Sequence, residues 1–152
     1  FSRWTHNSMR PREHILKARR LDASLNKLSP EDDFEMVIDL CMLAATHLLN
    51  AALHVEGVTH GHSDQSHTKM PPMEYYCKTP GETIQRGTDA LAVIEKLRPV
   101  YVRGPKPFDA QVADSCLANY AIAKNCFSDV IGDAANSREW SELSGGIGES
   151  TK

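Results

Sequence analysis

One long stretch of helix-forming residues, from Ser29 to Gly57, constrains the fold of this chain more than any other feature. Apolar residues recur in it every three to four positions, which is the spacing of one face of an α-helix. Ser29 can cap such a helix, Pro30 fits its first turn, and Gly57 can adopt the left-handed conformation that ends helices. We therefore predict a single helix over residues 30–56.

The same signals predict three further helices. Isoleucine and leucine recur at helical spacing over residues 11–28. Over residues 108–131, where Gly132 is expected to end the helix, the recurring residues are Val112, Cys116, Tyr120, Ala123, Phe127 and Ile131. Between them, the sequence from Thr79 to Glu82 has the pattern of a capping box, and Pro99 should stop the helix that it starts. Because no convincing strand pattern is present, we predict an all-α fold, an antiparallel up-and-down four-helix bundle. A long loop, residues 58–78, should join its second and third helices.

The length of the chain fits one domain. With 152 residues, it can bury one core but is short for two. We assign residues 1–133 to the bundle and expect residues 134–152 to form a tail with one short helical turn and then disorder. A net charge of −3 indicates no strong demand for nucleic acid or a membrane surface, although the first helix is locally basic.

Cysteine usage and hydropathy suggest a location in the cytoplasm. No two of the four cysteines have the C-x-x-C spacing of a zinc or redox motif, and three fall in apolar helical stretches. We therefore expect free, structural thiols, which suit a reducing compartment. No apolar run approaches 18 residues, so no membrane span is predicted.

Five of the seven histidines fall between His47 and His67. Imidazole titrates near neutral pH and is the commonest metal ligand, so special chemistry is expected here first. At about 100° per residue, His47, Asn50 and His54 share one face of the long helix. The sequence therefore predicts a site where the end of this helix meets the loop that carries His60, His62 and His67.

Several kinds of site fit these histidines. The simplest interpretation is that the helix histidines only form local hydrogen bonds. A second is a divalent metal, Zn, Ni, Cu or Fe, which could activate water in a hydrolase. Its candidate ligands are His54, His60, His62 and His67. A third is phosphotransfer, because A-T-H-L-L-N-A is similar to the A-H-x-L-K-G-x pattern of histidine phosphotransfer domains. Asn50 and Ala51, however, replace the lysine and glycine of that pattern.

A longer resemblance covers about residues 34–73. The helix A-A-T-H-L-L-N-A-A-L-H-V-E-G, followed by Q-S-H-T-K-M-P, resembles the central part of HEPN-type four-helix domains. The resemblance implies a domain, often a dimer, that binds nucleotides, RNA or a protein partner. It implies His54 and His67 as site residues with Asn50 beside them.

We add His47 to this binding site because it lies on the same helix face. Lys69, Arg19 or Arg20 would supply positive charge to the site. The R-x4-6-H motif of the ribonuclease members is absent from the chain. No catalytic residue is therefore assigned, and whether the protein is an enzyme stays open. The expected function is that of a homodimeric binding or accessory domain, and the alternative is a histidine-rich metal-binding bundle.

Overall fold

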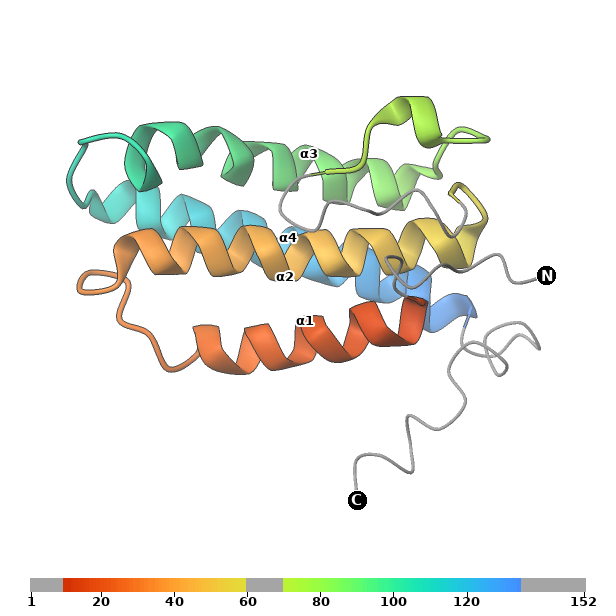
Figure 1. Cartoon of the computed structure of the whole chain (residues 1–152), viewed down its shortest axis with the longest axis horizontal. Helices are drawn as coiled ribbons and strands as arrows, with labels where there is room; N and C mark the ends of the chain where they lie inside the picture. Colours follow the sequence, from red (N-terminus) through yellow and green to blue (C-terminus); the bar gives the residue numbers. More distant parts are fainter. Residues whose placement is uncertain (1–9, 60–69, 135–152) are drawn as a thin grey trace, which may run out of the picture.

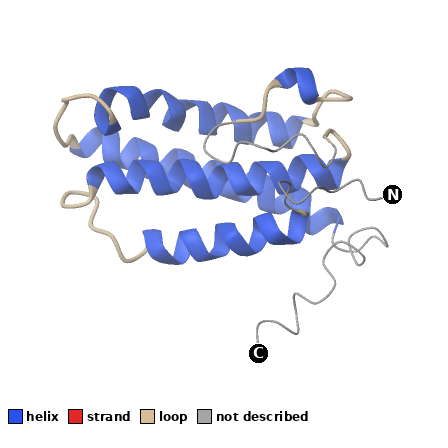
Figure 2. Ribbon diagram, viewed as in Figure 1, coloured by secondary structure: helices blue, strands red, loops and turns tan. Residues whose placement is uncertain are grey.

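A computed structural model describes residues 10–59 and 70–134 of the chain. The described residues form four α-helices and no strand, which confirms the predicted all-α, four-helix architecture (Figure 2). A 3-10 turn precedes the third helix and a π-helical turn, η2 (Arg98–Val102), follows it. The α-helices are α1 (Pro11–Leu25), α2 (Phe34–Glu56), α3 (Glu82–Leu97) and α4 (Ala110–Ala134). Of the tail expected over residues 134–152, Ala134 still belongs to α4, and residues 135–152 lie outside the described residues.

The helices are arranged around α2. Consecutive helices run in opposite directions along the long axis, with α1 and α3 on either side of α2 and α4 behind it (Figure 1). α2 packs against all three other helices, whereas α1 packs mainly against α2.

The central position of α2 explains its composition. Over 18 residues its mean hydropathy is 1.7, so it is long and apolar enough to cross a membrane by length and composition. This corrects the expectation that no such segment exists. However, 78% of that window is buried inside the bundle, and a helix that packs on several sides is apolar on several sides.

The apolar core lies mainly between α2, α3 and α4. Ile38 and Leu49 from α2, Leu91 from α3 and Phe127 from α4 are all fully buried there. A Cβ atom added at Gly87 would lie 2.4 Å from Cε1 of Phe127. The close approach of α3 to α4 therefore depends on the absence of a side chain at position 87.

The ends of α1 and α2 differ partly from the predictions. α1 ends at Leu25 rather than residue 28. Ser29 Oγ does accept a hydrogen bond from the Asp32 backbone N–H (3.1 Å), and the Asp33 carboxylate accepts one from the Ser29 N–H (2.8 Å). These bonds hold a turn, and α2 begins only after it, at Phe34. The predicted end is confirmed, because Gly57 has a φ of 81°.

The other helix ends also differ from the predicted ones, because of contacts with distant residues and of backbone hydrogen bonding. α3 begins at Glu82 rather than Thr79, and its Gly81 N–H donates to Glu56 Oε1 from the end of α2 (2.8 Å). Pro99 does not stop the helical path but widens it into η2, closed by an Arg103 N–H to Arg98 O bond (2.9 Å). α4 begins at Ala110 and runs through Gly132, because a single glycine is tolerated inside a helix.

Candidate functional site

Three histidines from two helices meet in the interior. His14 of α1 lies against His47 and His54 of α2, with ring centroids 5.1 Å and 6.1 Å apart. The exposed fractions are 0% for His14, 3% for His47 and 7% for His54. The side chains therefore form one buried imidazole cluster.

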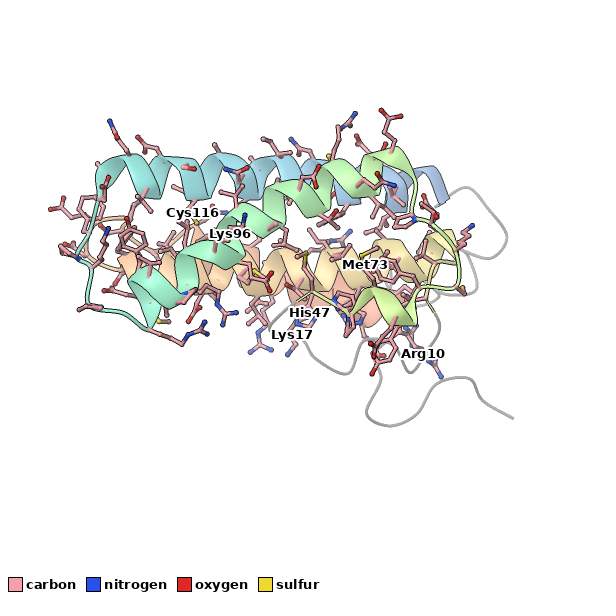
Figure 3. All side chains as sticks on the ribbon, turned by 90° about the horizontal axis from the view of Figure 1, so that it is seen from above. Arg10, Lys17, His47, Met73, Lys96 and Cys116 are labelled. Carbon is pink, nitrogen blue, oxygen red and sulfur yellow. The ribbon has the colours of Figure 1, made fainter. Side chains whose placement is uncertain are left out.

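The helical spacing of α2 places this cluster. His47, Asn50 and His54 follow one another at three and four residues, so they share one face of the helix. Figure 3 shows His47 at the edge of the molecule away from α4, whereas Cys116 of α4 lies on the opposite side of α2. Because His14 contacts rings two turns apart, it spans the part of α2 that carries Asn50.

Hydrogen bonds fix the orientation of the rings. Nδ1 of His14 and Nδ1 of His47 are 2.8 Å apart, so one of these nitrogens donates and the other accepts. The His54 Nδ1 lies 3.0 Å from Thr59 Oγ1 and 3.3 Å from the Thr59 carbonyl oxygen. Thr59 lies three residues after Glu56, the last residue of α2, so the chain that leaves the helix orients the His54 ring.

Two neighbouring polar residues are buried without such bonds. Thr46 and Asn50 are 0% and 1% exposed. The Thr46 hydroxyl and both polar atoms of the Asn50 amide have no hydrogen-bond partner among the described residues. A buried polar group left unsatisfied costs about 1–3 kcal/mol. The α2 face beside the imidazoles thus offers donors and acceptors that the described part of the fold does not use.

Positive charge borders this face. Arg10 and Lys17 are exposed and lie four residues before and three after His14, on the same side of α1. In Figure 3 they lie along the same edge of the molecule as His47. Arg19 and Arg20 are also exposed but lie roughly 120–140° around α1 from His14. An anionic group at the cluster would therefore meet Arg10 and Lys17 first.

The structure brings together some of the residues singled out from the sequence. His47, Asn50 and His54 lie on one face and are joined by His14, which the sequence analysis missed. The signal for His14 was its place on the apolar stripe of α1, one turn before Ala18. Other residues assigned to the site lie outside the described ranges, namely His60, His62, His67 and Lys69.

The predicted metal site has only one ligand within the described residues, His54. Among residues 10–59 and 70–134, no group of three histidine, cysteine, aspartate or glutamate side chains could hold a metal ion. The close pair formed by His14 and His47 uses its Nδ1 atoms on each other. A metal would therefore need the loop histidines as ligands.

A second polar cluster differs in that its groups are paired. Asp22 of α1 accepts hydrogen bonds from the Tyr120 hydroxyl (2.7 Å) and the Lys124 ammonium (3.1 Å), both from α4. It borders a groove of about 390 Å³ between these helices, lined also by Leu25 and Leu117. Burial, together with the hydrogen bond to Asp22, raises the pKa of Tyr120 above its ordinary value. This cluster ties α1 to α4.

Comparisons of the chain with protein-family models, with curated proteins and with solved structures find no match. The functional argument therefore rests on the geometry of the site.

Proposed function

We propose that this chain is a small binding or accessory domain of HEPN-like character, homodimeric and cytoplasmic, which holds a nucleotide or RNA. Its binding site is the α2 face that carries His47, Asn50 and His54, together with His14. A phosphate-bearing ligand fits both parts of this face. Its anionic group would meet the exposed cations Arg10 and Lys17, and its polar groups would meet the buried side chains.

One observation carries the proposal, namely the polar atoms of Thr46 and Asn50 that lack partners among the described residues beside the imidazole cluster. Buried polar side chains are nearly always hydrogen-bonded, so each exception requires an explanation. A core built for stability alone would place apolar side chains at these two positions. A bound ligand explains why polar residues occupy them.

Salt-dependent binding tests the proposal. We expect the protein to bind a labelled single-stranded oligoribonucleotide or a nucleoside triphosphate, with affinity that falls as salt rises. In Lys17→Gln, RNA affinity should fall, and the slope of log K against log salt should shrink by about 0.7, the value for one lost phosphate contact on a single strand. Fluorescence anisotropy over a range of salt concentrations measures both.

The matched control is Lys27→Gln, which removes an exposed lysine of the same charge beyond the far end of α1. It should leave both affinity and slope unchanged. Equal losses in the two variants would show diffuse attraction rather than a site. The absence of any binding at millimolar nucleotide and at high micromolar RNA would refute the proposal.

Elemental analysis tests the alternative, a divalent-metal site that could support hydrolysis. Protein purified without a histidine tag would have to carry a stoichiometric ion that His54→Ala loses. The described residues supply only His54 to that predicted ligand set, so the nucleotide or RNA interpretation is the one that the described geometry favours.

A further inference from the structure

We infer that Asn50 recognises a neutral, planar part of the ligand that presents a hydrogen-bond donor beside an acceptor, as a nucleobase edge or a primary carboxamide does. This inference rests on the proposed function, because it takes the α2 face as the ligand site. It goes beyond the proposed function because it assigns the chemical group of the ligand that Asn50 binds.

The amide of Asn50 is the starting point. Its oxygen accepts hydrogen bonds and its nitrogen donates them, and both atoms are buried without a partner among the described residues. The imidazoles around it are different, since His14 and His47 face each other and His54 faces Thr59. The amide therefore presents an unused donor and an unused acceptor on two separate atoms, whereas the Thr46 hydroxyl carries both functions on one oxygen.

The need to satisfy both atoms narrows the ligand chemistry. A phosphate or carboxylate could accept from Nδ2 but would leave Oδ1 without a donor. An ammonium group would do the reverse. A flat group with adjacent donor and acceptor satisfies both atoms at once, in the way that asparagine pairs with the N6 and N7 atoms of adenine.

The surroundings of Asn50 support this assignment. Thr46 lies one turn before it on α2 and His54 one turn after it, so polar side chains flank it along the helix. The hydroxyl of Thr46 can donate or accept, so it can bond to a third position on the same planar group. The charged part of the ligand would then remain at the edge marked by Arg10 and Lys17.

Access to the amide requires a movement of a side chain. Asn50 is 1% exposed, and His54 keeps the largest exposed fraction of the three clustered rings, 7%. The planar group therefore reaches Asn50 by displacing the His54 ring, and a bound probe should shift the resonances of His54 as well as those of Asn50.

The inference makes a paired prediction about stability and binding. Asn50→Leu replaces the amide with an apolar group of similar size, so the variant no longer buries two unused polar atoms. In the unliganded protein the melting temperature should rise, by about 3 °C or more. The same variant should lose affinity for the probes by about tenfold or more, because a site that hydrogen-bonds its ligand is sensitive to losing the partner.

Two pairs of probes distinguish the sources of the planar group. Adenine is compared with purine, which lacks the exocyclic amine, and nicotinamide with nicotinate, which has a carboxylate in place of the carboxamide. Selective binding of adenine indicates a nucleobase edge, and selective binding of nicotinamide indicates a carboxamide.

The side-chain amide signals of Asn50 in the wild-type protein, followed by NMR, report contact even if the variant folds poorly. Asn125→Leu, at an exposed asparagine of α4, is the control and should bind the probes unchanged.

Four results would overturn the inference. A lower melting temperature in Asn50→Leu would show that the amide forms an internal bond that supports the fold. Equal binding of each probe and its analogue, or undiminished binding by Asn50→Leu, would remove Asn50 from recognition. No response to any probe would also refute it. These outcomes are independent of the Lys17→Gln salt test, so RNA binding that survives while probe selectivity fails would refute this inference alone.

Discussion

The two faces of α2 are equally buried but differ in how fully their groups are satisfied. Toward α4, Ile38, Cys41 and Leu49 are fully buried and need only apolar contact. Beside the imidazole cluster, Thr46 and Asn50 are just as buried but carry polar atoms without partners among the described residues. One helix thus combines a conventional core face with a face that is incompletely satisfied.

This difference separates stability from function. Burying an aliphatic side chain stabilises a fold by about 1.5–3 kcal/mol, which accounts for the side of α2 that faces α4. Burying an amide without partners does the reverse. Structures tend to keep such groups where they serve another purpose, so substitutions on the two faces of α2 should have opposite consequences.

The largest effect is expected on the core side. Phe127→Ala empties the space where α4 meets α3 and should lower the free energy of unfolding by about 3–5 kcal/mol. Urea denaturation measures the loss. Ile122→Ala, on the exposed side of α4, is the control and should change the free energy by less than about 0.5 kcal/mol. A loss below about 1 kcal/mol in Phe127→Ala would show that this side is not closely packed.

A second prediction tests the same side by adding a methyl group. Gly87→Ala should destabilise the protein by about 1–3 kcal/mol, because the new Cβ would meet the Phe127 ring. Gly132→Ala should instead stabilise it by about 0.5–1 kcal/mol, because no atom lies within 4 Å of a Cβ at that helical position. Thermal unfolding of both variants shows whether each substitution lowers or raises the stability of the protein. The cost of Gly87→Ala should shrink in a Phe127→Leu background, and a constant cost would place the clash elsewhere.

Matched threonines test the polar face. Thr46→Val removes a buried hydroxyl without a partner among the described residues and should leave stability unchanged or raise it by up to about 1 kcal/mol. Thr59→Val removes the hydroxyl that pairs with His54 Nδ1 and should lower stability by about 1 kcal/mol. The two residues are similarly buried, at 0% and 3% exposed. Losses of equal size in chemical denaturation would mean that Thr46 is satisfied, and the contrast between the faces would disappear.

Local signals predicted the helices but not what they pack against. Periodicity and Gly57 were sufficient for the body and the end of α2, although not for its start, because amphipathic spacing and a left-handed glycine act within a few residues. The predicted start of α3 was wrong because Glu56, 25 residues before Gly81 in the chain, accepts the hydrogen bond of the Gly81 N–H in place of a local cap. The widened turn at Pro99 depends on the bond between Arg98 and Arg103, which spacing does not reveal.

The candidate site shows the same division. A helical wheel places His47, Asn50 and His54 on one face without a structure, because all three belong to one helix. It cannot supply His14, whose distance of 33 residues from His47 in the sequence is closed only by the packing of α1 on α2. The missing partners of Thr46 and Asn50 are likewise visible only once the surrounding side chains are placed.

The smallest predicted effect concerns the paired cluster between α1 and α4. Burial and the hydrogen bond to Asp22 raise the pKa of Tyr120, so the folded protein holds that proton after the unfolded chain has lost it. The unfolded phenol ionises near pH 10. Stability from Tyr120 is therefore fully present below about pH 10 and is lost progressively above it.

Tyr120→Phe should flatten the fall of the melting temperature between about pH 9 and pH 11. Tyr76→Phe is the control, since burial alone raises the pKa of that half-buried phenol, and it should flatten the fall less. If both variants retain the wild-type slope, Tyr120 does not hold its proton through Asp22, and the polar groups on the α4 side of the bundle are no better satisfied than those beside Asn50.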